Sequence, residues 1–182
     1  MPGCRRLSRT RAGLMLLLVG LPGYAVAGPP GSWTATSVHG TVLMLSQGEW
    51  LEVAEGESVA SGEAVRTLQA GRVQLERGRD LIVMAPDTAV LLDADKRPGR
   101  TTIEQYSGTL EIVADKGARV MVHTPAFTAD TTGGALQVRV RAGNAGLVVR
   151  RGAVTVSGGK SPRATVRAGQ TLNGAAGQTL QI

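Results

Sequence analysis

The sequence predicts an all-β domain, and three observations support that prediction. Short alternating or apolar runs bounded by turn residues recur along the chain, as in residues 72–76 (RVQLE) and 136–141 (LQVRVR). No long stretch shows the 3.6-residue period of an amphipathic helix. Aromatic residues make up only 3% of the chain, which suits an irregular β-solenoid with a core of small aliphatic side chains. A β-sandwich would give similar runs and is the alternative architecture.

Each predicted strand is an alternating or apolar run with a turn signal beside it. Some runs alternate and others, such as 81–85 (LIVMA) and 89–93 (AVLLD), are apolar throughout; both patterns are typical of strands. The predicted strands are 41–45, 72–76, 81–85, 89–93, 102–106, 109–114, 119–123, 136–141, 147–150, 153–157 and 164–168. Turns are expected at Gly48, Gly78, Pro98-Gly99, Lys116-Gly117, Gly133-Gly134, Gly158-Gly159 and Asn173-Gly174.

A faint internal repetition accompanies this pattern. The segment that starts at Gly71 resembles the one that starts at Gly108, and a third segment from Gly152 keeps the order of strand, glycine turn and strand. The starts are 37 and then 44 residues apart, so the period is irregular. Stacked β units of this kind can share one continuous core.

The N-terminus has the three parts of a secretory signal peptide. Arginines precede an apolar run at 14–21, and the small residues Ala25 and Ala27 stand before a cut between Ala27 and Gly28. A membrane helix needs about 20 apolar residues, so this run predicts a cleaved signal and no transmembrane segment in the mature chain. We therefore expect export to the periplasm, with secretion or the cell surface as alternatives. The arginines are Arg5, Arg6, Arg9 and Arg11.

This division gives the domain organisation and limits the chemistry. Residues 1–27 are the predicted signal peptide, 28–37 a short N-terminal segment, and 38–182 one β domain. The single cysteine, Cys4, leaves with the signal, so neither a disulfide nor thiol catalysis is expected.

The charge of the mature chain is unevenly distributed. Residues 28–115 carry 13 acidic and 7 basic side chains, whereas residues 116–182 carry 1 acidic and 9 basic side chains. This polarity favours head-to-tail contacts or an anionic partner, although a solvated arginine-rich surface is the simpler interpretation. Nucleic acid is not expected, because the mature chain has too few aromatic residues for base stacking. The candidate partner-binding residues are Trp50, Arg139, Arg141, Arg150, Arg151, Lys160, Arg163 and Arg167.

No motif supports catalysis, so neither an enzyme nor a cofactor is predicted. Gly159-Lys160-Ser161 ends like a phosphate-binding loop, but it lacks the upstream glycine and a following helix. Ser157 and Lys160 have acylation spacing, but two glycines between them favour a turn. His39 and His123 lie far apart in apolar strand contexts, which predicts local hydrogen bonds and no metal site.

An ordered set of segments resembles the FecR domain family. The resemblance spans roughly residues 38–172 and covers nearly all of the mature chain. The usual Arg-Gly-Thr-x-Phe that follows Thr-Pro is replaced here by residues 132–136 (TGGAL), of which only the glycine matches. The matching segments are ASGEAVRT (60–67), AGRVQLERG (70–78), MAPDTAVLL (84–92), SGTLEIV (107–113), VMVHTPAFTA (120–129), RGAVTV (151–156) and VRAGQTL (166–172).

The resemblance implies a function as well as a fold. FecR domains are periplasmic, β-rich and solenoid-like, and well-known members relay a signal from an outer-membrane transporter to a cytoplasmic sigma factor. With a cleavable signal peptide, this chain is not expected to touch a cytoplasmic sigma factor directly. We expect a non-catalytic protein-interaction or sensing module in envelope signalling, with an envelope protein as partner. The alternatives are a module that binds glycan, peptidoglycan or another anionic polymer, and a structural β-solenoid that forms homo-oligomers.

Overall fold

The computed structural model describes residues 31–93, 99–158 and 161–181. The predicted signal peptide, its cleavage point between Ala27 and Gly28, and Lys160 lie outside the described residues. These residues contain no helix long and apolar enough to span a membrane.

Within the described residues, 14 strands form a single sheet, and all of their pairings are antiparallel. The first eight strands are β1 (Trp33–His39), β2 (Val42–Ser46), β3 (Glu49–Glu52), β4 (Ser58–Val59), β5 (Glu63–Thr67), β6 (Arg72–Arg77), β7 (Asp80–Met84) and β8 (Ala89–Asp93). They are followed by β9 (Arg100–His123), β10 (Thr128–Arg141), β11 (Asn144–Arg151), β12 (Ala153–Gly158), β13 (Ser161–Arg167) and β14 (Thr171–Ala175).

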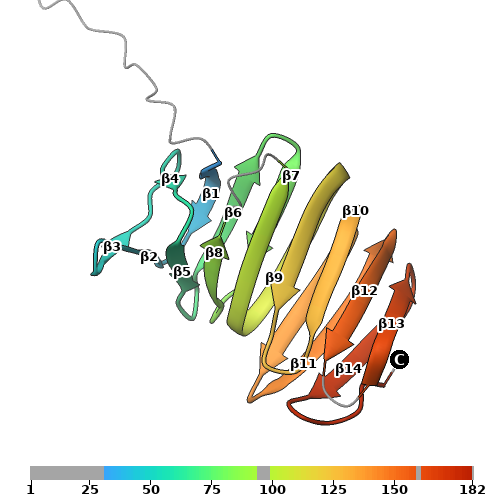
Figure 1. Cartoon of the computed structure of the whole chain (residues 1–182). Helices are drawn as coiled ribbons and strands as arrows, with labels where there is room; N and C mark the ends of the chain where they lie inside the picture. The colour runs from blue at the N-terminus through green and yellow to red at the C-terminus, as the bar shows by residue number, and fades with distance from the viewer. Residues whose placement is uncertain (1–30, 94–98, 159–160, 182) are drawn as a thin grey trace, which may run out of the picture.

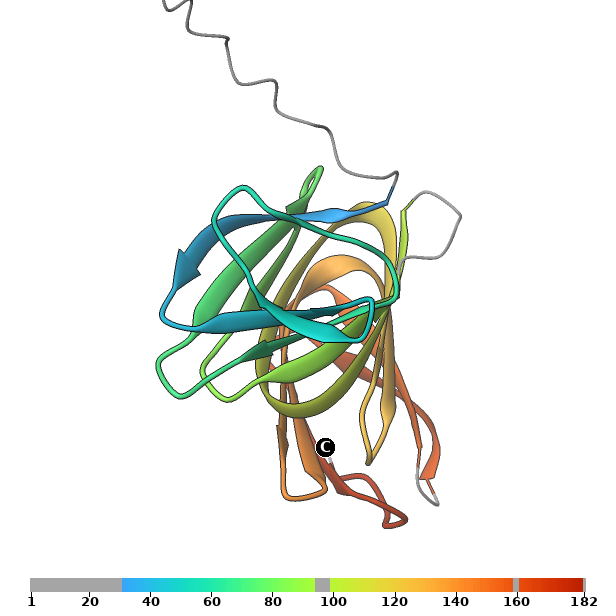
Figure 2. The ribbon, with the colours of Figure 1, turned by 90° about the vertical axis from the view of Figure 1, so that its left-hand side faces the viewer.

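The sheet curls into two layers that face each other, and the strands of each layer follow one another along a common axis (Figure 1). Viewed from the β3 end, the two layers bend around a common interior like a half-barrel (Figure 2). The first layer contains the whole of β3, β2, β5, β8, β12 and β13, together with the two ends of β9 and the first half of β10. The second layer contains β4, β1, β6, β7, the middle of β9, the end of β10, β11 and β14.

The two longest strands pass through both layers. In β9, residues 102–107 pair with β8, residues 110–113 pair with β7, and residues 119–123 pair with the start of β10. β10 then bends, its register shifting between Thr132 and Gly134, and its second half pairs with β11. Both layers are therefore covalently continuous at the centre of the stack.

One hydrophobic core runs the length of this stack. Its members are mainly valine, leucine, isoleucine and alanine, as the low aromatic content predicted. Trp33 and Phe127 are its two aromatic residues. The alternation of buried and exposed residues along β6, β8 and β11 matches a strand with one face in the core. The all-β prediction is confirmed, and the stacked units share one core as expected of a solenoid-like fold.

Some predicted turns are wrong. Lys116-Gly117 lies inside β9 and Gly133-Gly134 inside β10, where the glycines bend a strand that continues. Asn173-Gly174 lies inside β14. The glycines of the two long strands do have positive φ, but a positive φ bends a strand as readily as it closes a hairpin.

The faint repetition does not produce equivalent units. β6 and β7, in the segment from Gly71, form a hairpin within the second layer. In the segment from Gly108, residues 109–123 instead belong to one strand that crosses from the second layer to the first. The strands also begin earlier than residue 38, because β1 pairs with β4 and β6 from Trp33 onward.

The glycine bend in β10 provides a test of this packing. A Cβ on Gly134 (φ +118°) would lie 2.4 Å from the Arg151 carbonyl oxygen, whereas a Cβ on Gly143 (φ +78°) would meet nothing within 4 Å. We expect Gly134→Ala to lower the free energy of unfolding by roughly 3 kcal/mol, through backbone strain and overpacking.

The control, Gly143→Ala, should lower it by about 1 kcal/mol, because only its φ is unfavourable. Urea unfolding followed by tryptophan fluorescence measures both changes. Equal losses in the two variants would contradict the packing role of Gly134.

Candidate functional site

The predicted basic residues do not form one patch. Arg139, Arg141 and Arg150 are exposed on the outer face of the second layer, on β10 and β11. Arg163 and Arg167 are exposed on β13 in the first layer. Arg151 is exposed where β11 ends, and Lys160 lies outside the described residues. The two layers thus separate side chains that are close in sequence.

Two of these arginines are engaged with neighbours. The Arg150 guanidinium lies 3.5 Å from the Glu111 carboxylate, and Gln137 Nε2 donates a hydrogen bond to the same carboxylate at 3.2 Å. Arg139 Nε donates to Thr109 Oγ1 at 3.3 Å. All of these groups are exposed, so the contacts order the surface more than they stabilise the fold.

Arg139 and Arg141 form a ridge between two hollows. One hollow, of about 400 Å³, is lined by amide side chains that include Asn144, Asn173 and Gln181. The other, of about 360 Å³, is lined on its far side by Asp87, Ser107 and Thr109. This arrangement offers many hydrogen-bond donors on an open surface, which suits carboxylate or hydroxyl groups.

A larger polar hollow, of about 620 Å³, lies where β9 and β10 bend. Arg119 and Asp130 form a two-bond ion pair in it, with nitrogen–oxygen distances of 3.0 and 2.5 Å. The hydrogen bond from Arg119 to Asp130, reinforced by the charge of the carboxylate, raises the pKa of the guanidinium. Because Arg119 and Asp130 neutralise each other across β9 and β10, we assign this pair a structural role.

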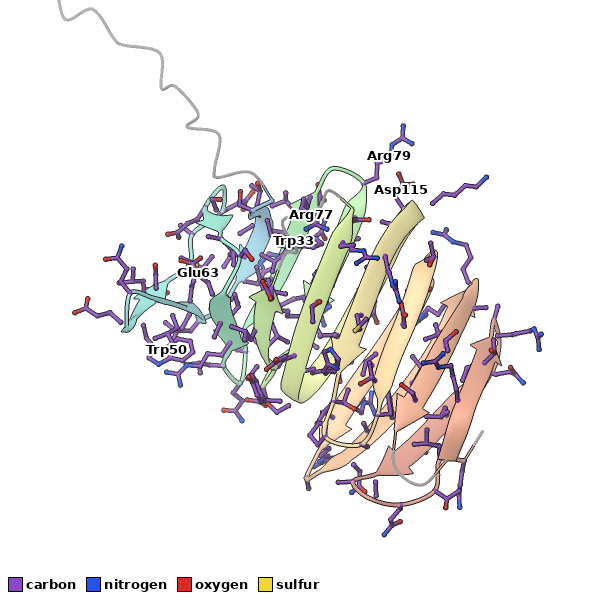
Figure 3. All side chains as sticks on the ribbon, in the orientation of Figure 1. Trp33, Trp50, Glu63, Arg77, Arg79 and Asp115 are labelled. Atoms are coloured by element: carbon purple, nitrogen blue, oxygen red, sulfur yellow. The ribbon has the colours of Figure 1, made fainter. Side chains whose placement is uncertain are left out.

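Trp50 occupies a different kind of surface, at the end of the stack where β3 is the edge strand (Figure 3). Its side chain is 42% exposed and that of its neighbour Leu51 is 45% exposed. The Arg66 guanidinium lies 4.1 Å from the centroid of the Trp50 ring, a cation–π contact that orients the indole. Leu51 pairs with Met44, which faces the core, so the inward-facing row ends at an uncovered leucine.

The sequence did not predict where the second mature tryptophan, Trp33, lies. Trp33 is buried in the core, with the Arg77 guanidinium 4.6 Å from its ring centroid. Arg77 also contacts Thr101 and forms an ion pair with the buried carboxylate of Asp80. Asp80 accepts a hydrogen bond from the Asp115 backbone amide at 2.9 Å. Trp33 therefore packs in the interior, which leaves Trp50 as the exposed tryptophan among the described residues.

The histidines make the local contacts that were predicted. His39 Nε2 lies 3.4 Å from Ser37 Oγ, and His123 Nδ1 lies 2.9 Å from Thr128 Oγ1. Within the described ranges, no group of three His, Cys, Asp or Glu side chains gathers closely enough to hold a metal ion.

The fold has counterparts among solved structures. Two crystal structures of a "putative anti-sigma factor" from Parabacteroides distasonis match this chain with a TM-score of 0.56 each and sequence identities of 12% and 13%. The matches cover 65% of this chain and 57% of that protein, so this chain corresponds to little more than half of it. The two proteins share a fold. No protein-family model and no curated protein matches the chain.

An exposed tyrosine on the first layer gives a pH-dependent test of the surface geometry. The Tyr106 hydroxyl donates a hydrogen bond to Glu104 at 2.8 Å. This bond, with desolvation and the negative carboxylate, raises the pKa of Tyr106 above its ordinary value. We expect Glu104→Gln to lower the pKa of Tyr106, as read from phenolate absorbance, whereas the distant Glu111→Gln should leave it unchanged.

The sign of the stability effect follows from the raised pKa. The stability contributed by Tyr106 is complete below the unfolded pKa of about 10 and is lost as the pH rises through the higher folded value. An identical Tyr106 titration in the wild type and Glu104→Gln would contradict the hydrogen bond.

Proposed function

We propose that this chain is a FecR-domain protein of the bacterial envelope that works without catalysis, as a protein-interaction and sensing module. The observation that carries the proposal is the fold shared with the anti-sigma factor protein of P. distasonis. The ordered FecR-like segments agree with that likeness, and the signal-peptide pattern favours the periplasm.

The departure from the family motif is compatible with this proposal. Gly133, the residue that matches the family pattern, has φ +82° at the bend of β10. Leu136 stands at the position of the family's phenylalanine and is buried in the core. An aliphatic side chain can fill that position because the surrounding core is itself aliphatic.

The surface we propose for partner binding is the free edge of β3. An edge strand can accept an extended partner segment through its unpaired backbone groups, while exposed side chains such as Trp50 and Leu51 give the contact specificity and apolar area. Trp50 suits this role because tryptophan is enriched among the residues that dominate interface energies.

Site-directed crosslinking of the exported chain in envelope extracts tests this function. We expect Trp50→Ala to abolish a crosslinked partner band, whereas Leu68→Ala should retain it, because Leu68 is equally exposed (42%) but lies outside β3. Retention of every band in Trp50→Ala would contradict the assignment of β3.

The ridge between the two hollows favours a second function, the binding of an anionic or hydroxyl-rich polymer. Arg139 and Arg141 project from adjacent outward positions of β10. Their joint replacement by alanine should release the chain from peptidoglycan in co-sedimentation at low salt, and added salt should do the same to the wild type. The control is joint replacement of Arg72 and Arg79, which are exposed and lie away from the ridge. Equal sedimentation of both variants would reject a site at the ridge.

A further inference from the structure

The first layer has a free edge strand at each of its two ends. At one end, β3 pairs with β2 alone, and at the other, β13 pairs with β12 alone. In the second layer, β4 spans only two residues, and Gln181 covers the edge of β14 by exchanging backbone hydrogen bonds with Asn173 at 2.8 and 2.9 Å. The long uncovered edges therefore belong to β3, here called the head edge, and to β13, here called the tail edge.

The head edge has a defined set of free backbone groups. β2 and β3 are joined by a two-residue turn at Gln47 and Gly48, both with positive φ. In such a hairpin the residues next to the turn form a hydrogen-bonded pair, and the pattern then alternates. Accordingly, Glu49 and Leu51 bond to β2, while the amide and carbonyl groups of Trp50 and Glu52 point away from the sheet.

The tail edge has a matching set. The Ala168 amide bonds to the Gly152 carbonyl at 3.0 Å, which fixes the alternation along β12 and β13. The backbone groups of Thr165 then point away from the sheet. The register of β12 and β13 shifts between Val156 and Gly158, so the alternation applies up to Ala164 and not to Arg163. The Arg167 amide also points outward, where it donates to the Gln170 side chain at 2.8 Å.

One antiparallel register joins the two edges. If Trp50 lies opposite Thr165 as a hydrogen-bonded pair, Glu52 comes beside Arg163. Both of these side chains are exposed and opposite in charge, so this register pairs them across the new contact.

The same register brings one pair of inward-facing apolar side chains together. Leu51 lies opposite Ala164, while the exposed Glu49 lies opposite Val166 at the end of the paired segment. The uncovered end of the core beside Leu51 would thereby be closed.

Charge favours this pairing over contact between two head edges. Residues 49–63 hold five glutamates and no basic residue, whereas β13 carries Arg163 and Arg167 without an acidic residue. Contact between two head edges would bring the acidic segments of both copies together, and like charges disfavour such a contact. A basic edge is the complementary partner.

We infer that the head edge of one copy of this chain binds the tail edge of a second copy, so that copies associate head to tail. This inference rests on the proposed function of β3 as a binding edge and names its partner. Such an interface is heterologous, because different surfaces meet, and its repetition extends the stack copy by copy.

Sedimentation velocity of residues 28–182 over a range of concentrations tests the inference by a charge swap. Glu52→Arg and Arg163→Glu should each weaken self-association by about tenfold, because each places like charges opposite each other. The double variant, and an equimolar mixture of the two single variants, should recover association. The matched controls Glu104→Arg and Arg72→Glu alter exposed charges away from both edges and should behave like the wild type.

Circular dichroism establishes that each variant is folded. A wild type that stays monomeric in low salt, or a double variant that associates no better than the single ones, would overturn the inference. If self-association fails but Trp50 is still required for crosslinking to a different envelope protein, the proposed function stands and only the head-to-tail inference is rejected. If that crosslink is absent as well, both the inference and the proposed function are rejected.

Discussion

The structure depends on two strands that bend without ending. β9 and β10 run through both layers, and at two of their bends the backbone is too crowded for a side chain. At Gly108 a Cβ would lie 2.2 Å from Thr88 Oγ1, and at Gly134 it would lie 2.4 Å from the Arg151 carbonyl. Because the strands continue through these points, the two layers cannot separate and a single core serves both. The remaining strands extend this centre in each direction.

The surface features that suit partner binding by β3 and β13 lie at the ends of the stack. The interior consists mainly of small aliphatic side chains, and two of its buried polar residues, Asp80 and Thr131, form hydrogen bonds with the backbone. The exposed tryptophan, the uncovered leucine beside it and the free edges of β3 and β13 are terminal features. The proposed binding by strand addition needs no deep pocket, and the hollows on the sides of the stack are open.

Much of the fold follows from local sequence pattern. Strands such as β6, β8 and β12 alternate or are apolar, and a period of two is a direct consequence of the pleat. β3 was missed because the sequence EWLE lacks a buried position, and all four residues are exposed. The bends of β9 and β10 were read as turns, because a glycine with positive φ gives the same signal in both settings.

The candidate site was less predictable, because it depends on which layer each strand joins. The unequal charge of the two halves is visible in the sequence and places acidic residues near β3 and basic residues near β13. The separation of Arg139 from Arg163 onto different layers required the pairing pattern. Of the two mature tryptophans, Trp33 is in the core and Trp50 is outside it, a difference set by long-range packing.

Hydrogen exchange at β3 tests the account most directly. The amides of Trp50 and Glu52 point to the free edge, whereas those of Glu49 and Leu51 bond to β2 and provide a control within the same strand. We predict rapid exchange at Trp50 and Glu52 in dilute protein and protection of both as the concentration rises, with Leu51 protected throughout. Exchange at Trp50 and Glu52 that does not depend on concentration would contradict the binding of this edge to a second copy.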